Sequence, residues 1–386
     1  MDSITHIVLG ATIGEALAGK KLGKRALLLG AVAQSLPDID FVASSWLDTS
    51  RDVWAHRGIT HSFLFVLLLT PLLTWIAQRS MTIGRRGGAI GRRDGAARLG
   101  DARLGGPRSG PGPMTRRDWW VFFSLQLFVH IFIDAFNAYG TGWFEPFSSY
   151  RVSFNVLFVA DPFYSCWLGL SFLALLILKS GSPSRKKWVR FGLLLSSAYL
   201  CYCLGNKWWV DTRVERDLRQ QGIRYDRYFT TPTPLNSWLW YVVVENSAGY
   251  HIGYRSVFDS RSDLFQWVPR NDSLLQPFRG RSDVQYLLRF AGGYYTVEQW
   301  KGDGGGARGW TTEGGGKDTA GGGKDSLVFN VLRFGEMRGW EYTRTHFVFH
   351  YFLQYPGDNG LVVQRGRFAG WNRESLLAFI RRIRGN

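Results

Sequence analysis

Two long apolar stretches constrain the fold of this chain more than any other feature. Residues 61–78 (HSFLFVLLLTPLLTWIAQ) and 163–178 (FYSCWLGLSFLALLIL) contain no Asp, Glu, Lys or Arg. Their lengths approach the roughly 20 residues that a membrane-spanning helix needs. These stretches exclude a wholly soluble enzyme and a disordered chain, and the 3 cysteines are too few for a disulfide scaffold.

The apolar pattern predicts an α-helical membrane domain of about six segments. The first two segments are the weakest, because 16 residues of helix span only about 24 Å of a hydrocarbon core of about 30 Å. Pro37 also interrupts the second segment, so we expect these two to form a short hairpin that either thins the bilayer or crosses it only in part. The expected segments are residues 4–19, 26–43, 61–78, 119–138, 162–178 and 190–205.

The basic residues in the connecting loops predict an orientation. Loops 20–25, 79–118 and 179–190 hold 4, 10 and 5 Lys or Arg, which makes nineteen, whereas loops 44–60 and 139–161 hold three between them. Short loops rich in Lys and Arg stay in the cytoplasm. We therefore expect a multi-pass protein of a bacterial inner membrane, with the chain after residue 205 outside the cytoplasm.

The remainder of the chain has a different character. Residues 206–386 are rich in aromatic and β-branched residues with Gly, Asn and Pro between them, which is typical of an antiparallel β-rich domain. The sequence thus divides into a helical membrane domain, 1–205, and an extracytoplasmic β-rich domain, 206–386. A Gly/Arg-rich disordered cytoplasmic loop is expected at 84–113 and a Gly-rich insertion at 301–325. Strands are expected in 238–246, 283–300, 326–335 and 346–355, and a closing helix in 374–384.

Ionisable residues gather in the helical domain, and most of them have a simple structural explanation when taken singly. A lone His at a helix start is usually a cap or an interfacial residue, two Asp after a Pro are ordinary turn chemistry, and Asp161 before Pro162 is most simply an N-cap. His130 and Asp134 are harder to explain in this way, because residues four apart share a helix face and ionisable residues in a span are costly. The candidates are His6, Asp38, Asp40, His56, Arg57, His61, His130 and Asp134.

The predicted orientation brings these residues to one depth. His130 lies about 17 Å and Asp134 about 23 Å along an outward-running helix, at about 1.5 Å per residue. The other candidates stand at the outer ends of their segments. Neutral imidazoles with carboxylates predict a site for a divalent metal, Zn²⁺ or Mn²⁺, and the surplus of ligands suggests two ions. The predicted metal ligands are His6, Asp38, Asp40, His56, His61, His130 and Asp134, with Asp38, Asp40 and Arg57 in catalytic roles; one of the two Asp is either a base or a ligand.

The same residues carry a resemblance to a known family. Thr5-His6, Gly10, Pro37-Asp38-Ile39-Asp40, His56 to Ser62 (HRGITHS), and His130 with Asp134 resemble the YdjM type of bacterial inner-membrane proteins, which are predicted metal-dependent hydrolases. The resemblance covers roughly residues 1–235 and implies a membrane protein with a hydrolase site. The His-x-x-x-Asp helix is also loosely similar to that of zinc-dependent phospholipase C, which favours phosphoesters.

Three functional hypotheses follow. The first is a membrane-bound metal-dependent hydrolase acting on a lipid or lipid-linked phosphoester at the outer face of the inner membrane, with Arg57 holding the phosphate. The second is a non-enzymatic membrane scaffold or metal-binding protein whose β domain binds an envelope partner. The third, nucleic-acid binding, is suggested by the net charge of +17. It requires aromatic residues among the basic ones, and residues 84–113 have none, so we expect no specific nucleic acid.

Overall fold

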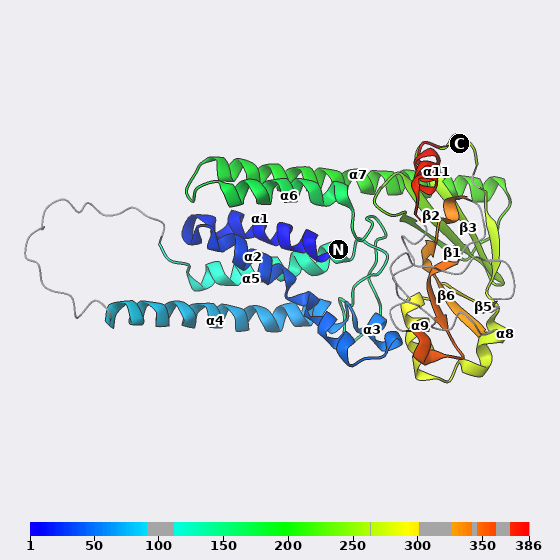
Figure 1. Cartoon of the computed structure of the whole chain (residues 1–386), viewed down its shortest axis with the longest axis horizontal. Helices are drawn as coiled ribbons and strands as arrows, with labels where there is room; N and C mark the ends of the chain where they lie inside the picture. The colour runs from blue at the N-terminus through cyan, green and yellow to red at the C-terminus, as the bar shows by residue number, and fades with distance from the viewer. Residues whose placement is uncertain (91–111, 263, 301–325, 342–345, 360–370, 386) are drawn as a thin grey trace, which may run out of the picture.

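The helices of the N-terminal half lie side by side with their axes roughly parallel (Figure 1). The computed structural model describes residues 1–90, 112–262, 264–300, 326–341, 346–359 and 371–385. The helical half contains α1 (Ser3–Leu22), α2 (Arg25–Ser35), η1 (Pro37–Ser45), α3 (Thr49–Ala55), η2 (Ile59–His61), α4 (Phe63–Ile90), α5 (Arg116–Asp134), α6 (Pro162–Ile177) and α7 (Ser184–Gln220).

Each predicted segment is helical, but its length and composition do not always fit a membrane span. In the described residues two helices are long and apolar enough to cross a membrane, within Phe63–Ser80 of α4 and in α7. A third is counted if α2 and η1, which are bent by 56° at Pro37, form one broken span. The helix α6 is apolar but shorter. The structure therefore supports a helical region with two or three candidate spans, and the number six is not confirmed.

Helices α1 and α2 pack closely enough that glycines form their contact. A Cβ on Gly30 would collide with the carbonyl oxygen of Gly10 and lie 2.9 Å from the Cα of Gly14. Small residues at such positions let helix backbones approach in a membrane. The approach also positions two polar groups: the amide of Gln126 donates to the carbonyl of Gly10 at 2.9 Å, and Gln34 at the end of α2 lies against His130 of α5.

We predict that Gly30→Ala weakens the fold and disturbs the neighbouring polar cluster. The added methyl group has to push α1 and α2 apart, and overpacking of this kind costs typically about 1–3 kcal/mol. The measurement is the thermal unfolding midpoint in detergent. Gly169→Ala in α6 is the matched control, because nothing lies within 4 Å of its added Cβ. Equal midpoints for the two variants would show that the close approach is not needed.

The C-terminal half contains two antiparallel sheets. One has the strand order β1-β2-β3-β4 and the other β5-β6-β7. Aromatic and aliphatic side chains from both sheets and from α9 and α11 share one buried core. The elements are β1 (Arg227–Pro232), β2 (Leu239–Glu245), β3 (Gly249–Ser256), β4 (Gln266–Pro269), α8 (Asp272–Leu275), η3 (Gln276–Phe278), α9 (Ser282–Ala291), β5 (Tyr295–Trp300), β6 (Ser326–Glu336), η4 (Gly339–Glu341), β7 (Phe347–Phe352), η5 (Pro356–Asn359) and α11 (Arg373–Ile383).

Several elements expected in residues 206–386 are confirmed, and one is wrong in part. The strands expected in 238–246, 326–335 and 346–355 and the closing helix are present as β2, β6, β7 and α11. Of the strand expected in 283–300, residues 295–300 form β5, whereas residues 283–291 form α9. Val284, Leu287 and Ala291 of this segment are buried, and their spacing of three and four follows the helical period.

Two further boundaries differ from the sequence expectation. The helix α7 continues to Gln220, well past residue 205, and runs alongside the sheets (Figure 1). The helix α4 continues to Ile90, so residues 84–90 of the expected disordered loop are helical. Residues 91–111 of that loop and all of the insertion 301–325 lie outside the described residues.

The sheets lie beyond one end of the helices, and the chain's N-terminus lies at that same end (Figure 1). The short helix α3 packs on α9, and Val53, Trp54 and Tyr139 contact the core of the sheets. The loops that join the helices at this end are therefore held between the helical half and the sheets.

Candidate metal centre

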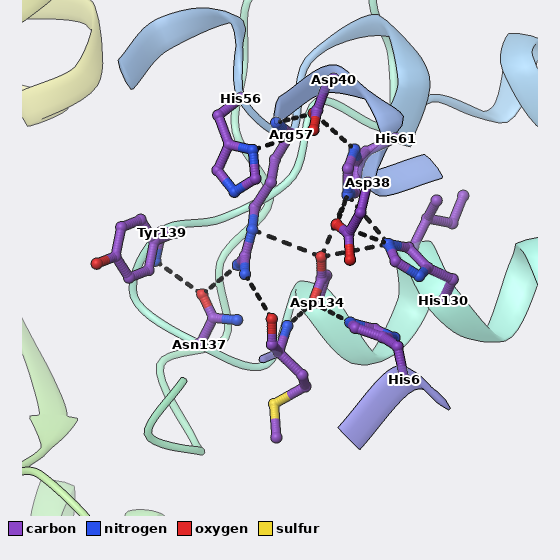
Figure 2. Close-up of polar contacts among 12 residues, drawn as sticks. His6, Asp38, Asp40, His56, Arg57, His61, His130, Asp134, Asn137 and Tyr139 are labelled. Atoms are coloured by element: carbon purple, nitrogen blue, oxygen red, sulfur yellow. Dashed lines mark hydrogen bonds and ion pairs between the residues drawn. The ribbon is translucent and has the colours of Figure 1, made fainter. Parts of the chain in front are cut away.

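Four side chains converge at the end of the helices that faces the sheets. Asp38 comes from η1, His61 from η2, and His130 and Asp134 from the last turns of α5. One ligand atom from each lies within 4.8 Å of the others (Figure 2). His61, His130 and Asp134 are fully buried, whereas the side chain of Asp38 is 18% exposed and forms the open edge of the cluster.

The hydrogen bonds behind the two imidazoles fix their tautomers. The Nδ1 of His130 contacts the carbonyl oxygen of Gln34, which can only accept, so this nitrogen carries the proton. The hydroxyl of Thr60 donates to Asp40 and therefore accepts from the Nδ1 of His61 at 3.0 Å. Burial away from water disfavours a second proton, and with it a positive charge, on either ring. Both rings thus present the unprotonated Nε2 to the cluster.

The spacing of the four atoms fits a metal ion. The two Nε2 atoms are 3.1 Å apart, and their distances to the Asp38 and Asp134 oxygens are 3.3–3.7 Å. A tetrahedral ion with ligand bonds of about 2.0–2.1 Å separates its ligand atoms by about 3.3–3.4 Å. The Oδ2 of Asp134 is buried and accepts no hydrogen bond from any described residue. Two nitrogen lone pairs and two carboxylate oxygens at these distances repel one another, and a cation between them would remove this repulsion. The N-terminal ammonium of Met1 and the guanidinium of Arg57 contact Asp134 from outside the four atoms and offset the charge of that carboxylate.

His6 lies beside the cluster without adding a fifth ligand atom to it. Its ring stacks on that of His130, with 3.8 Å between the centroids, and its Nε2 contacts the Oδ1 of Asp134 at 3.1 Å. The oxygen that faces the cluster is the other one, Oδ2. This contact orients the carboxylate, as groups behind metal ligands commonly do. Whether His6 also binds a metal stays a prediction.

Arg57 faces Asp134 from the opposite side. The backbone of Arg57 is left-handed, with φ of 62°, and this turns the chain sharply between His56 and His61. Its guanidinium is buried: Nε lies 3.5 Å from Asp134 Oδ2, and Nη1 donates to the side-chain oxygen of Asn137 at 2.8 Å. These contacts hold the charge of Arg57 against the candidate ligand Asp134, and its expected contact with a substrate phosphate stays a prediction.

Asp40 and His56 form a second polar pair next to the cluster. The Oδ1 of Asp40 contacts the Nδ1 of His56 at 3.1 Å, and its Oδ2 accepts from the backbone N–H of Arg57 at 2.8 Å and lies 3.5 Å from the Nδ1 of His61. The side chain of His56 is 37% exposed, so its Nε2 is reachable from outside. Asp40 therefore contacts the Nδ1 atoms of both imidazoles. Neither Asp40 nor His56 belongs to the four-ligand group, which is Asp38, His61, His130 and Asp134.

The remaining sequence candidate, Asp161, has a structural role. Its Oδ1 accepts from the backbone N–H of Phe163 at 2.9 Å and caps the start of α6, as expected. Three residues that support the cluster, Gln34, Thr60 and Asn137, are not among the site residues predicted from the sequence. No spacing pattern identifies Gln34, because a backbone carbonyl rather than its side chain makes the contact with His130.

The comparisons with known proteins agree on a family. Residues 1–210 match the family described as YdjM inner membrane protein. The inner membrane protein YbcI of Escherichia coli (strain K12) is 26% identical over 150 residues, which are 38% of this chain and 69% of the relative. The uncharacterized protein YfhP of Bacillus subtilis (strain 168) is 26% identical over 204 residues, 47% of this chain and 52% of the relative. No solved structure matches. Because the family match covers more than half of the 386 residues, from the N-terminus to the middle of α7, this chain belongs to the YdjM family of inner membrane proteins.

Proposed function

We propose that this protein is a membrane-bound metal-dependent hydrolase that acts on a lipid or lipid-linked phosphoester at the outer face of the bacterial inner membrane. The observation that supports the proposal most strongly is the pair of Nε2 atoms 3.1 Å apart, both unprotonated and both facing carboxylate oxygens. Imidazole and carboxylate ligands suit Zn²⁺ or Mn²⁺. One ion fits Asp38, His61, His130 and Asp134, and a second ion next to Asp40 and His56 stays a prediction.

The residues around the cluster suggest how hydrolysis would proceed. A bound divalent ion would polarise a phosphoryl oxygen and lower the pKa of water. His56 is the group best placed to accept a proton, because Asp40 holds its Nδ1 and leaves Nε2 free on the exposed side. Arg57 positions Asp134 and offsets its charge. Asp38, the most exposed of the four ligands, marks the side from which a substrate would approach.

A lipid substrate is favoured by the surface next to Asp38. Ile39 is 56% exposed and Phe41 is 67% exposed, and both belong to η1, the element that supplies Asp38. Apolar side chains at the edge of a polar cleft are suited to acyl chains. A water-soluble phosphoester would need no such surface.

We propose further that the helical half forms a membrane domain of six segments and that residues 206–386 form an extracytoplasmic β domain. The nineteen-to-three distribution of basic residues supports this topology, since the cluster and the sheets lie at the end of the helices away from the basic loops (Figure 1). A reporter active only outside the cytoplasm should be active when fused after Asn386. Activity of a cytoplasm-only reporter at that position would contradict the topology and the outward-facing site.

One observation favours the non-enzymatic alternative. Four protein ligands close the coordination of a tetrahedral ion, and closed sites are usually structural, whereas catalytic zinc keeps an open position. In that case the ion would hold α5 against η1 and η2, and the protein would act as a membrane scaffold or metal-binding protein. A five- or six-coordinate ion would leave room for water.

The experiment that separates the two candidates measures metal content and turnover on the same purified protein. The hydrolase predicts bound Zn²⁺ or Mn²⁺ and release of product from a member of a panel of phosphoester lipids. Bound metal without turnover on the panel would support the scaffold. Absence of metal after loading would contradict both the hydrolase and the scaffold held together by a metal ion.

A further inference from the structure

A cleft lies between the helical half and the sheets and is lined by Asn137, the residue that holds Arg57 beside the metal centre. Asn137 and Tyr139, which follow α5, line one side of it. Tyr241 of β2, Arg333 of β6 and Trp340 of η4 line the other side. The cleft thus lies where a group extending from the metal centre towards the sheets would be held.

Three polar groups that line the cleft are buried without a partner among the described residues. They are the side-chain N–H groups of Asn137 and Trp340 and the hydroxyl of Tyr241, on residues that are 1%, 4% and 2% exposed. The orientation of the Asn137 amide is set by its oxygen, which accepts from both Arg57 and the backbone N–H of Tyr139. A buried donor without a partner costs about 1–3 kcal/mol. Three such groups around one cleft indicate that something bound there accepts hydrogen bonds.

The backbone of β6 is distorted where it lines the cleft. The register between β6 and β7 shifts between Val331 and Glu336, and Arg333 lies within this irregular segment. Such irregularities in a strand are common next to functional sites, because they re-aim side chains. Gly335 in the same segment has φ of 80° and lies 3.7 Å, measured from its ideal Cβ position, from the ring of Tyr241. A side chain at Gly335 would therefore enter the space beside Tyr241.

The chemistry of the lining is selective. Asn137, Tyr241 and Trp340 offer hydrogen-bond donors, and the guanidinium of Arg333 donates to the carbonyl oxygen of Phe290 at 3.3 Å and has no carboxylate partner in the described chain. Glu336 is the one carboxylate among the lining residues. Donors and a guanidinium suit a group with several oxygen acceptors. A trimethylammonium group offers no acceptor to the three unpartnered donors.

We infer that this cleft binds a hydroxylated, uncharged or anionic head group, such as a glycerol or a sugar, of the phosphoester whose phosphate lies at the metal centre. The inference rests on the proposed function of that centre. The two sites are joined by Asn137, whose oxygen holds Arg57 at 2.8 Å while Arg57 contacts Asp134 at 3.5 Å. A substrate with its phosphate at Asp38 and its head group among Asn137, Tyr241 and Trp340 would use both. Choline and ethanolamine esters would leave the donors of Asn137, Tyr241 and Trp340 without an acceptor, because a quaternary or protonated amine accepts no hydrogen bond.

The test compares two soluble probes that share a phosphate and differ in the attached alcohol. Glycerol 3-phosphate and phosphocholine are titrated by calorimetry into full-length, metal-loaded protein in an uncharged detergent. We expect glycerol 3-phosphate to bind at least tenfold more tightly. Tyr241→Phe removes one hydroxyl and should weaken binding of glycerol 3-phosphate about threefold to tenfold, the worth of one hydrogen bond. Phosphocholine binding should not change.

Two further variants make the test specific. Trp340→Phe removes a donor from a different element and should show the same selective loss, with metal content unchanged. Tyr225→Phe is the control, because Tyr225 is 38% exposed and does not line the cleft. Equal affinity for the two probes, preference for phosphocholine, no binding of either, or unchanged binding in both cleft variants would overturn the inference. Selective binding without hydrolysis would support the head-group site and contradict the hydrolase. Hydrolysis without selectivity would support the hydrolase and contradict the head-group site.

Discussion

Replacing His130 with Ala or Asp134 with Asn is expected to remove the bound metal and to abolish turnover. Each change deletes a candidate ligand atom or its charge; both residues are fully buried, and the Nε2 of His130 lies 3.7 Å from the Oδ2 of Asp134. The protein should still insert into the membrane, because both changes make the helix less polar or less charged. Activity should fall further than metal content, since the chemistry depends on ligand geometry as well as occupancy. Metal content is measured on correctly inserted, monodisperse protein.

The competing explanation for this pair predicts a different kind of result. If His130 and Asp134 only join helices, losing them should cost about 0.6 kcal/mol, up to about 2 kcal/mol, and leave the metal in place. His251→Ala is the matched control, because His251 lies on β3 and packs on Trp267, away from the cluster. Full metal occupancy in both His130→Ala and Asp134→Asn would show that neither residue binds the metal.

His56→Ala is expected to reduce turnover by about 10²–10⁴-fold while the metal stays bound. The magnitude is that of removing a group that transfers a proton in the transition state. The metal should stay because His56 contributes no atom to the four-ligand group, and its ring lies 6.2 Å from that of His61, centroid to centroid. Single-turnover rates at saturating substrate and metal content are the two measurements. Ile59→Ala, a change at an exposed residue of the adjacent η2, is the control.

The outcomes for His56 distinguish three roles. A loss of metal equal to the loss of activity would make it a ligand, as the sequence alone suggested. Unchanged turnover would remove the Asp40–His56 pair from the chemistry. A fall in turnover at constant metal content would support proton transfer.

The position of the site was predictable from the sequence, because it follows from two independent patterns. The basic residues predict which loops share a side of the membrane, and the helical rise then predicts a depth for His130 and Asp134. The structure brings both residues together with Asp38 and His61 at one end of the helices. The pairing of His130 with Asp134 needed only the four-residue spacing within one regular helix.

Which of these residues face the four-ligand group, and which lie beside it, was not predictable from the sequence. Asp38 and Asp40 are two residues apart, and only the 3-10 geometry of η1 and the left-handed backbone of Arg57 decide which one faces the cluster. His56 and His61 are separated by the same turn, so one points outward and the other inward. Spacing rules apply to regular helices, and these residues lie where regular structure is interrupted.

In the C-terminal half, too, the sequence predicted some elements and not others. Strands with dense aromatic and β-branched residues, such as β2, were evident from composition. The segment Ser282–Ala291 also contains aromatic residues, but it forms α9 and buries Val284, Leu287 and Ala291 at helical spacing. The cleft lined by Asn137, Tyr241 and Trp340 depends on how two halves of the chain meet, which no local pattern encodes.

The central claim is that two imidazoles and two carboxylates hold a divalent metal at the end of α5. X-ray absorption at the edge of the metal bound to the purified, full-length protein tests it most directly. The account predicts a first shell of nitrogen and oxygen at about 2.0–2.2 Å with the outer-shell scattering of two imidazole rings, and loss of that imidazole scattering in His61→Ala. A shell of oxygen alone, a shell containing sulfur, or a spectrum unchanged in His61→Ala would contradict it.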